Sequence, residues 1–292
     1  MIKLRSYAKI NLYLDVGEKL NNGYHCIETI FQTINLFDEI KIEKIDKPIY
    51  HIECNNPEIP VDKTSIVYRA IEIIMKGKNY GVAVYINKKI PIAAGLGGGS
   101  SNVATVLLGI SKLYKLDVNS KKMQSIATSL GMDVPFFLER GTVYAIGRGE
   151  ILSPLDLGDM PLHLILVNPG FEISTKWAYQ AFDKANADNF KKPYIGIMKM
   201  IETKSIVSLP ELSKYIYNSF DSIICKQYPI IKEIKDTLFE SGAISATISG
   251  SGPTVYGVME NRSKANEVYN KMKNKFTFVC RAMTVKAREI YV

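Results

Sequence analysis

Four glycines lie within the five residues from Gly95 to Gly99, and two serines, Ser100 and Ser101, follow them. Behind the serines, apolar residues recur at helical spacing from residue 103 to residue 113, which predicts a helix. A glycine-rich turn that leads into a helix presents unpaired backbone N–H groups and the positive end of the helix dipole. The group that fits such a turn is a phosphate. The segment expected to hold phosphates consists of Pro91, Ile92, Ala93, Ala94, Gly95, Leu96, Gly97, Gly98, Gly99, Ser100 and Ser101.

This phosphate loop is of neither of the two familiar kinds. A P-loop needs a Gly-Lys-Ser/Thr sequence, and no lysine occurs between Lys89 and Lys112. The dinucleotide-binding fingerprint fails because Ser100 stands where its third glycine belongs. A flexible linker is the alternative. Linkers are polar on both sides, however, whereas this loop lies between an apolar strand-like run at 82–86 and the predicted helix.

Lys9 is the first candidate for a catalytic partner of the loop. Residues 8–15 alternate in polarity, which predicts a strand with one buried face and places Lys9 on its polar face. A solvated surface lysine is the alternative interpretation. The polar face would carry Lys9, Asn11, Tyr13 and Asp15, and the buried face Ala8, Ile10, Leu12 and Leu14.

Asp133 is the second candidate. It follows Gly131, at which a predicted amphipathic helix over 120–130 ends, and Pro135 disfavours helical geometry at Val134. We therefore expect a carboxylate held on a constrained bend. A purely structural Asx turn is the alternative.

A second glycine loop covers Ile248 to Thr254 and lies between two predicted strands. Its alternative interpretation is a simple hairpin connection. His25, His51 and His163 are widely separated in sequence, so no histidine metal site is predicted.

The composition is that of an ordinary globular protein, with 47% hydrophobic and 23% charged residues. No apolar run reaches the roughly 18 residues of a membrane span, and the N-terminus lacks the core of a signal peptide, so we expect a cytoplasmic protein. Four scattered cysteines predict neither a disulfide framework nor a zinc site. The net charge of +8 is compatible with a cleft that attracts polyphosphates.

Strands and helices alternate irregularly, which favours the α+β class. A turn-rich stretch at 153–161 is the expected boundary between two domains, 1–155 and 156–292. Predicted strands lie at 8–15, 26–36, 39–45, 81–87, 142–146, 162–167, 246–249, 254–259 and 276–284, and further predicted helices at 63–76, 175–185, 194–202, 211–225, 230–241 and 263–273.

Three motifs together resemble those of the GHMP kinase family. They are the loop Pro91–Ser101, the early Ala8-Lys9-Ile10-Asn11-Leu12 and the late Ser249-Gly250-Ser251-Gly252-Pro253, so the resemblance spans nearly the whole chain. It implies an N-terminal ribosomal-protein-like α/β domain with the ATP-binding glycine loop, a C-terminal α+β domain, and an active site in the cleft between them. It further implies that ATP is the co-substrate and that Lys9 and Asp133 occupy the two catalytic positions.

Other segments are similar to those of family members that phosphorylate the tertiary 2-hydroxyl of a cytidine-diphosphate-linked polyol, in the non-mevalonate route to isoprenoid precursors. The segments are Asn22–His25, Glu28–Gln32, Gly131–Phe137, Gly149–Leu152 and Asn168–Gly170. This resemblance implies that Tyr24 stacks on the cytosine ring, that His25 hydrogen-bonds to it, and that Asn11, Thr175, Tyr179 (opposite Tyr24) and Gly250 also contact the substrate.

The implied reaction is direct in-line transfer of the γ-phosphoryl group, in which positioning and electrostatics carry most of the catalysis. Asp133 would accept the hydroxyl proton, and Lys9 would stabilise both that carboxylate and the transferring group. Mg²⁺ follows from the chemistry rather than from a ligand cluster. Ser65 departs from the family pattern, in which many relatives carry an asparagine near the adenine.

Three alternatives stay open at this point. The nearest is another GHMP small-molecule kinase, of homoserine or mevalonate type, against which Tyr24 and His25 argue. A nucleic-acid-binding protein would need basic residues interleaved with aromatic ones, and the sequence has no such segment. A catalytically inactive sensor is disfavoured by the presence of Lys9, Asp133 and both glycine loops. We thus expect a small-molecule substrate, no nucleic-acid or membrane partner, and a monomer or weak homodimer.

Overall fold

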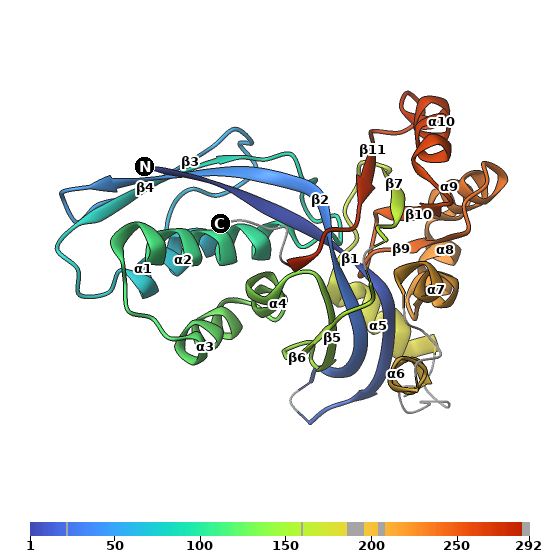
Figure 1. The fold of residues 1–292 in the computed structure, drawn as a ribbon, viewed down its shortest axis with the longest axis horizontal. Coiled ribbons are helices and arrows are strands. Elements are labelled where there is room, and N and C mark those ends of the chain that lie inside the picture. The colour runs from blue at the N-terminus through green and yellow to red at the C-terminus, as the bar shows by residue number, and fades with distance from the viewer. Residues whose placement is uncertain (22, 159, 186–195, 204–207, 288–292) are drawn as a thin grey trace.

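Two long antiparallel strands run through the molecule and give it its shape (Figure 1). They are β1 (Ile2–Lys19) and β2 (His25–Ile45), and the computed structural model describes them together with the rest of residues 1–21, 23–158, 160–185, 196–203 and 208–287. Two predicted strands, 26–36 and 39–45, are thus one continuous strand. Asp38, the expected break, lies inside it and is fully buried.

The first sheet is assembled on these two strands. Its main path has the order β3-β4-β2-β1-β8, and β5 pairs with the other half of β2 and carries β6 at its far edge. The short strand β8 comes from far along the chain and runs parallel to β1. These strands are β3 (Tyr50–Cys54), β4 (Gly81–Asn87), β5 (Thr142–Gly147), β6 (Ile151–Leu155) and β8 (Tyr217–Asn218).

Four helices cover one face of this sheet and enclose an apolar core. The helix α2 (Gly98–Tyr114) packs against both long strands. Its Gly109 is required there because a Cβ would lie 2.5 Å from Ile42 Cδ1. Leu107 and Ile71 join Ile42 and Val84 in the same buried cluster. The helices are α1 (Ile66–Ile74), α2 (Gly98–Tyr114), α3 (Ser120–Leu130) and α4 (Val134–Glu139).

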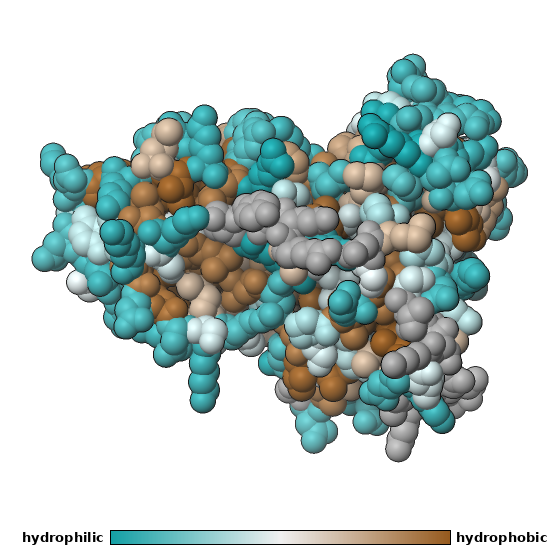
Figure 2. All heavy atoms as spheres, in the orientation of Figure 1, coloured by the Kyte–Doolittle hydropathy of each residue, from teal (hydrophilic) through white to brown (hydrophobic). Residues whose placement is uncertain are grey.

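The second sheet is antiparallel, has the order β11-β7-β10-β9, and is flanked by helices. Figure 2 shows hydrophilic side chains over the surface that α10 forms, whereas its Ala265, Val268 and Met272 are buried. The elements are β7 (His163–Asn168), β9 (Ser245–Ile248), β10 (Val255–Met259), β11 (Phe278–Met283), α5 (Thr175–Ala185), α6 (Gly196–Glu202), α7 (Leu209–Leu212), the 3-10 helix η1 (Ser213–Tyr215), α8 (Asp221–Gln227), α9 (Pro229–Glu240) and α10 (Arg262–Met272).

The two sheets share a hydrophobic core, which holds them together. Ile10 and Ile30 from the first sheet are fully buried in one cluster with Leu164 and Tyr256 from the second. β6 ends at Leu155 on the first sheet, and the chain then passes to β7 on the second. The predicted α+β class is confirmed. The exact division at residue 155 stays a prediction.

The prediction of one helix over 211–225 is wrong. The chain instead forms α7, η1 and the strand β8 before α8 begins at Asp221. Asn218 explains the interruption, because its Nδ2 donates to the backbone carbonyls of Ile248 (3.0 Å) and Gly250 (2.9 Å) and holds the chain extended beside β1. Tertiary hydrogen bonds thus override the helical spacing of the apolar residues. Among the described residues, no helix combines the length and apolar character that a membrane span requires.

Candidate active site

Lys9 is a buried cation rather than a surface lysine. Its residue is 4% exposed, and its Nζ donates to Asn11 Oδ1 at 2.7 Å. Asp133 Oδ2 lies 3.6 Å from the same nitrogen, and the Phe31 ring centroid lies 5.1 Å away. Burial lowers the pKa of Lys9, and the charge of Asp133 opposes that shift. A cation held like this is poised beside a carboxylate that reaches the surface.

The strand alternation predicted for residues 8–15 is correct as far as Leu12, which packs in the core with Ala8 and Ile10, and wrong beyond it. Asn11 pairs with Phe31 and Tyr13 with Ile30, so β1 holds one extra residue at this point, a β-bulge. The bulge reverses the faces of the residues that follow. Leu14 therefore lines the same cavity as Lys9 and Asn11, and Tyr13 turns into the core between the sheets.

Asp133 lies directly before α4, and the bend expected there is part of a helix start. Val134 is the first helical residue, contrary to the prediction from Pro135. The proline occupies the first turn of α4, where its missing N–H has no intrahelical partner to lose. The Asp133 side chain makes no capping hydrogen bond and is 38% exposed. Its carboxylate is thus available to Lys9 and to a ligand.

The glycine loop closes over Lys9 and leads into α2. The Lys9 N–H donates to Leu96 O at 3.0 Å, which ties the loop to β1. Gly97 caps α2 with φ +68°, and a Cβ there would lie 2.6 Å from Phe137 Cζ. No side chain caps the helix, and a Cβ at Gly99 would have no atom within 4 Å. The space beside Gly99 at the start of α2 is therefore open, whereas a Cβ at the preceding Gly98 would lie 2.8 Å from Lys88 Nζ.

The second glycine loop is both a hairpin connection and a wall of the site. It joins β9 to β10, which pair antiparallel. Ser249 Oγ donates to Gly95 O at 2.8 Å, and a Cβ at Gly95 would lie only 2.0 Å from Ser249 O. Ser251 Oγ is 2.9 Å from Thr175 Oγ1 on α5. The two glycine loops, far apart in sequence, are therefore in direct contact.

A cavity of about 160 Å³ brings the predicted residues together. Hollows of about 640 and 600 Å³ lie elsewhere on the surface, but none of the predicted site residues lines them. Both polar and apolar side chains line the small cavity. Its predicted members are Lys9, Asn11, Gly95, Gly97, Asp133, Thr175, Tyr179 and Gly250, and its other lining residues are Leu14, Ile27, Phe31, Phe220 and Ser251.

His25 and Tyr179 form the adjoining aromatic pair. Their rings are stacked with centroids 4.9 Å apart, and His25 is buried. His25 Nε2 lies 2.6 Å from Asp183 Oδ1, a contact to which no sequence motif pointed. Burial, with the Asp133 charge behind it, raises the pKa of Tyr179 to about 12. Tyr179 is also part of the wall of the small cavity, so the pair adjoins it.

Tyr24 lies at the surface next to this pair. It is 53% exposed, and the Arg148 guanidinium lies 5.3 Å from its ring centroid. The ring stacked on Tyr179 is that of His25, and the expected position of Tyr179 opposite Tyr24 stays a prediction. Asn22, the first residue of this motif, lies outside the described residues.

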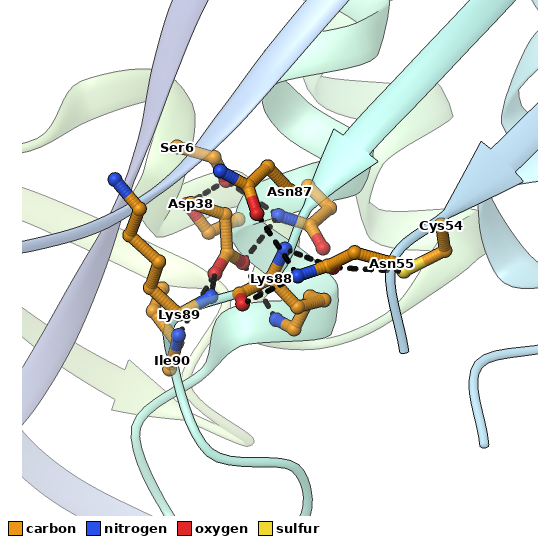
Figure 3. A network of polar contacts seen from close by, with 10 residues as sticks. Ser6, Asp38, Cys54, Asn55, Asn87, Lys88, Lys89 and Ile90 are labelled. Atoms are coloured by element: carbon orange, nitrogen blue, oxygen red, sulfur yellow. Dashed lines mark hydrogen bonds and ion pairs between the residues drawn. The ribbon is translucent and has the colours of Figure 1, made fainter. Parts of the chain in front are cut away.

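A polar network around Asp38 fixes both ends of the glycine loop (Figure 3). At its entry, Oδ1 accepts from the backbone N–H groups of Lys89 (2.8 Å) and Ile90 (2.9 Å), and Oδ2 accepts from Lys88 Nζ (2.6 Å). At its exit, Oδ2 also accepts from Asn102 Nδ2 of α2 (2.8 Å). Sequence reasoning missed Asp38. The signal was that Asp38 stands two residues before Ile40, on the face that the alternation of Ile40 and Ile42 marks as buried.

Ser65 has a structural role in place of the family's asparagine. It is 3% exposed, and its Oγ accepts from the Val67 N–H as the N-cap of α1. A hydroxyl committed in this way offers little to an adenine ring.

Comparison with known proteins agrees with this geometry. The model of the GHMP kinases N terminal domain matches residues 65–141, and that of the GHMP kinases C terminal matches residues 206–277. The chain belongs to the GHMP kinase family. Both glycine loops of this GHMP kinase fall within the matched parts.

Comparison with individual proteins shows which GHMP kinases this chain is similar to. The 4-diphosphocytidyl-2-C-methyl-D-erythritol kinase of Caldanaerobacter subterraneus subsp. tengcongensis is 36% identical over 286 residues, 97% of each chain. A crystal structure of 4-(cytidine 5'-diphospho)-2C-methyl-D-erythritol kinase matches with 27% identity and a TM-score of 0.80, over 97% of this chain and 99% of that one. Homoserine kinase from Cytophaga hutchinsonii shares the fold at 17% identity and a TM-score of 0.71, over 98% and 94%.

Proposed function

We propose that this GHMP kinase transfers the γ-phosphoryl group of ATP to the 2-hydroxyl of 4-diphosphocytidyl-2-C-methyl-D-erythritol. The observation that carries the proposal is the Lys9–Asp133 pair, 3.6 Å apart, in a cavity that both glycine loops line. The choice of substrate is supported by relatives of that name that are 36% identical over nearly the full length. It is further supported by the His25–Tyr179 stack beside the cavity.

Asp133 is the proposed proton acceptor for the substrate hydroxyl. Its carboxylate is partly exposed and is not used to cap α4, so a hydroxyl in the cavity can reach it. General-base assistance of this kind is worth about 10²–10⁴ in rate. Lys9 lies beside this carboxylate and is placed to stabilise charge on the transferring group.

The loop Pro91–Ser101 is the proposed phosphate site. The amides at the start of α2, which no side chain caps, and the open space beside Gly99 leave room for a phosphate group. Among the described residues no group of three or more His, Cys, Asp or Glu side chains is placed to hold a metal ion. The donors present therefore fit Mg²⁺ that is bound mainly through phosphate oxygens and water. When bound, Mg²⁺ would neutralise charge on the β- and γ-phosphates.

The cytidine end of the substrate is proposed to bind at Tyr24, His25 and Tyr179. Tyr24 is an exposed ring that a base can cover, and His25 is oriented by Asp183. Thr175, Asn11 and Gly250 lie around the cavity, where they can contact the polyol. The division into domains 1–155 and 156–292, the cytoplasmic location, the monomeric or weakly dimeric state and the absence of nucleic-acid and membrane partners stay predictions.

A coupled assay of ADP release tests the proposed function. The purified chain is supplied with ATP, Mg²⁺ and one of three acceptors: 4-diphosphocytidyl-2-C-methyl-D-erythritol, homoserine or mevalonate. We expect ADP release with the first acceptor alone. Activity confined to homoserine or mevalonate rejects the substrate, and ADP release without any acceptor rejects the assignment of a specific transferase.

A further inference from the structure

Three buried hydrogen bonds connect Lys9 to a main-chain carbonyl. Lys9 Nζ donates to Asn11 Oδ1 (2.7 Å), and Asn11 Nδ2 donates to Thr29 Oγ1 (2.8 Å). The Thr29 hydroxyl in turn donates to Tyr13 O (2.6 Å). Lys9, Asn11 and Thr29 are at most 4% exposed, so water does not replace these partners. Thr29 belongs to the Glu28–Gln32 segment, to which the proposed function gives no role.

The donors and acceptors in this series of hydrogen bonds are fixed because the series ends at a backbone carbonyl. A carbonyl oxygen can only accept, and a hydroxyl has one proton to donate, so Thr29 spends that proton on Tyr13. Its oxygen can then only accept from Asn11, which turns the amide NH₂ toward Thr29. The amide oxygen consequently faces Lys9. In the opposite orientation, the NH₂ group would face an ammonium that can only donate.

The β-bulge after Asn11 makes this geometry possible. It shifts the strand register between Asn11 and Tyr13 on β1. The side chain of Asn11 and the carbonyl of Tyr13 consequently both hydrogen-bond to Thr29 on β2. Tyr256 Oη also donates to Asn11 O at 2.7 Å, which fixes the backbone of Asn11 from the second sheet. With its backbone held, the amide of Asn11 has only its own rotation left, and Thr29 determines it.

We propose that Thr29 is a positioning residue: it orients the Asn11 amide so that its oxygen holds the Lys9 ammonium beside Asp133. Its importance for turnover rests on the proposed function. Thr29 lies behind Asn11 and does not line the cavity, so it does not touch the substrate. Its effect is exerted through the placement and charge of Lys9.

Removal of the Thr29 hydroxyl has a specific consequence for Lys9. In Thr29→Val, nothing fixes the amide, and the ammonium loses its acceptor at 2.7 Å for part of the time. The titratable and charged side chains that face Lys9 from the described elements are Asp133 before α4 and, behind it, Tyr179 on α5. The other neighbours, Phe31 and both glycine loops, carry no charge. A weaker hold therefore lowers the pKa of Lys9 further.

The kinetic test compares Thr29→Val with Thr29→Ser, which keeps the hydroxyl. For Thr29→Val we expect kcat at neutral pH to fall about tenfold, equivalent to about 1.4 kcal/mol, and the alkaline limb of kcat to move to lower pH. The KM for ATP should stay within about twofold, because neither Thr29 nor Asn11 belongs to the phosphate loop. Thr29→Ser should restore most of kcat and the position of the limb.

Thr33→Val is the matched control. Thr33 is a buried threonine of the same strand and is paired in register with Lys9, but its Oγ1 accepts from the Gly141 N–H and not from the Asn11 amide. The Thr33→Val variant should lower the melting temperature about as much as Thr29→Val does. Its kcat and the alkaline limb of kcat should be unchanged. Equal kinetic effects of the two valine variants would show that Thr29 is merely structural.

An NMR titration separates this proposal from the proposed function. The ¹³Cε signal of Lys9, assigned by its absence in Lys9→Arg, reports its pKa without any substrate. We expect a lower pKa in Thr29→Val than in the unmodified chain, Thr29→Ser and Thr33→Val. An unchanged Lys9 pKa overturns the proposal even if the kinase activity is found, and a lowered pKa supports it even if the acceptor proves to be a different one.

Discussion

Substitution of Asp38 by asparagine should destabilise the fold far more than its small change of shape suggests. Asp38 is fully buried, and its two oxygens accept from Lys88 Nζ, Asn102 Nδ2 and two backbone N–H groups. Asparagine has one oxygen only, so its NH₂ group must face donors on one side. It also leaves the Lys88 ammonium, whose side chain is 5% exposed, without a counter-charge.

The magnitude follows from the burial of both partners. Breaking a buried ion pair by removal of one partner costs about 3–5 kcal/mol, because the other charge stays buried and unpaired. For chains of 150–250 residues, each kcal/mol moves the melting temperature by about 2–4 °C, so we expect a fall of about 10 °C. The neighbouring Glu39 provides the matched control, because its side chain is 51% exposed in its pair with Lys89 and exposed pairs contribute little to stability.

Scanning calorimetry and urea denaturation of Asp38→Asn and Glu39→Gln measure this difference. Addition of Lys88→Met to Asp38→Asn should recover part of the loss, because the unpaired buried charge is then gone. Two results would refute the reasoning. One is a loss below about 1 kcal/mol for Asp38→Asn, and the other is a loss equal to that of Glu39→Gln.

Three further predictions concern the catalytic base, the glycine loop and a buried carboxyl. Asp133→Asn should lower kcat at least about tenfold while ATP still binds, as measured by turnover and calorimetric titration; unchanged turnover removes Asp133 from the mechanism. Gly97→Ala should destabilise the chain by about 1–3 kcal/mol, because its Cβ would lie 2.6 Å from a phenylalanine ring at φ +68°, whereas Gly99→Ala, with open space, should not; equal melting temperatures contradict this. Burial, together with Asp15 opposite it, raises the pKa of Glu28 above its ordinary value of 4.5. The protonated carboxyl of Glu28 therefore contributes its full stability to the fold below pH 4.5, and this contribution is lost as the pH rises through the raised pKa. Glu28→Gln should therefore be more stable by about 0.5 kcal/mol at pH 7 and no more stable at pH 4, and a destabilised variant in urea denaturation at pH 7 would contradict the argument.

Local patterns predicted those parts of the fold that local forces determine. The strand Gly81–Asn87, the helix Ser120–Leu130 and the helix Thr175–Ala185 have the bounds that their periodicity and punctuation indicated. The same is true of the glycine turn that leads into α2. In each case the decisive information, such as a glycine at a cap or an apolar stripe, lies within the element itself.

Contacts between distant segments explain the parts that could not be predicted. The interruption at Asn218 depends on two carbonyls about 30 residues away in sequence, at Ile248 and Gly250. The continuity of β2 through Asp38 depends on donors that arrive about 50 and 64 residues later. No window of the sequence contains both members of these pairs. A buried aspartate in a strand therefore reads as a turn until its partners are known.

The bulge after Asn11 unites the fold and the chemistry of the site. Without it, Tyr13 and Asp15 would continue the polar face begun by Lys9, and the cavity would be lined by polar groups that admit water. With it, Leu14 enters the wall beside Ile27, Phe31 and Phe220. Apolar walls lower the local dielectric constant, so the attraction between Lys9 and Asp133 is stronger than it would be in water. One extra residue in a strand thus supplies the apolar walls beside which the Lys9 ammonium is placed to act on a carboxylate and a transferring phosphoryl group.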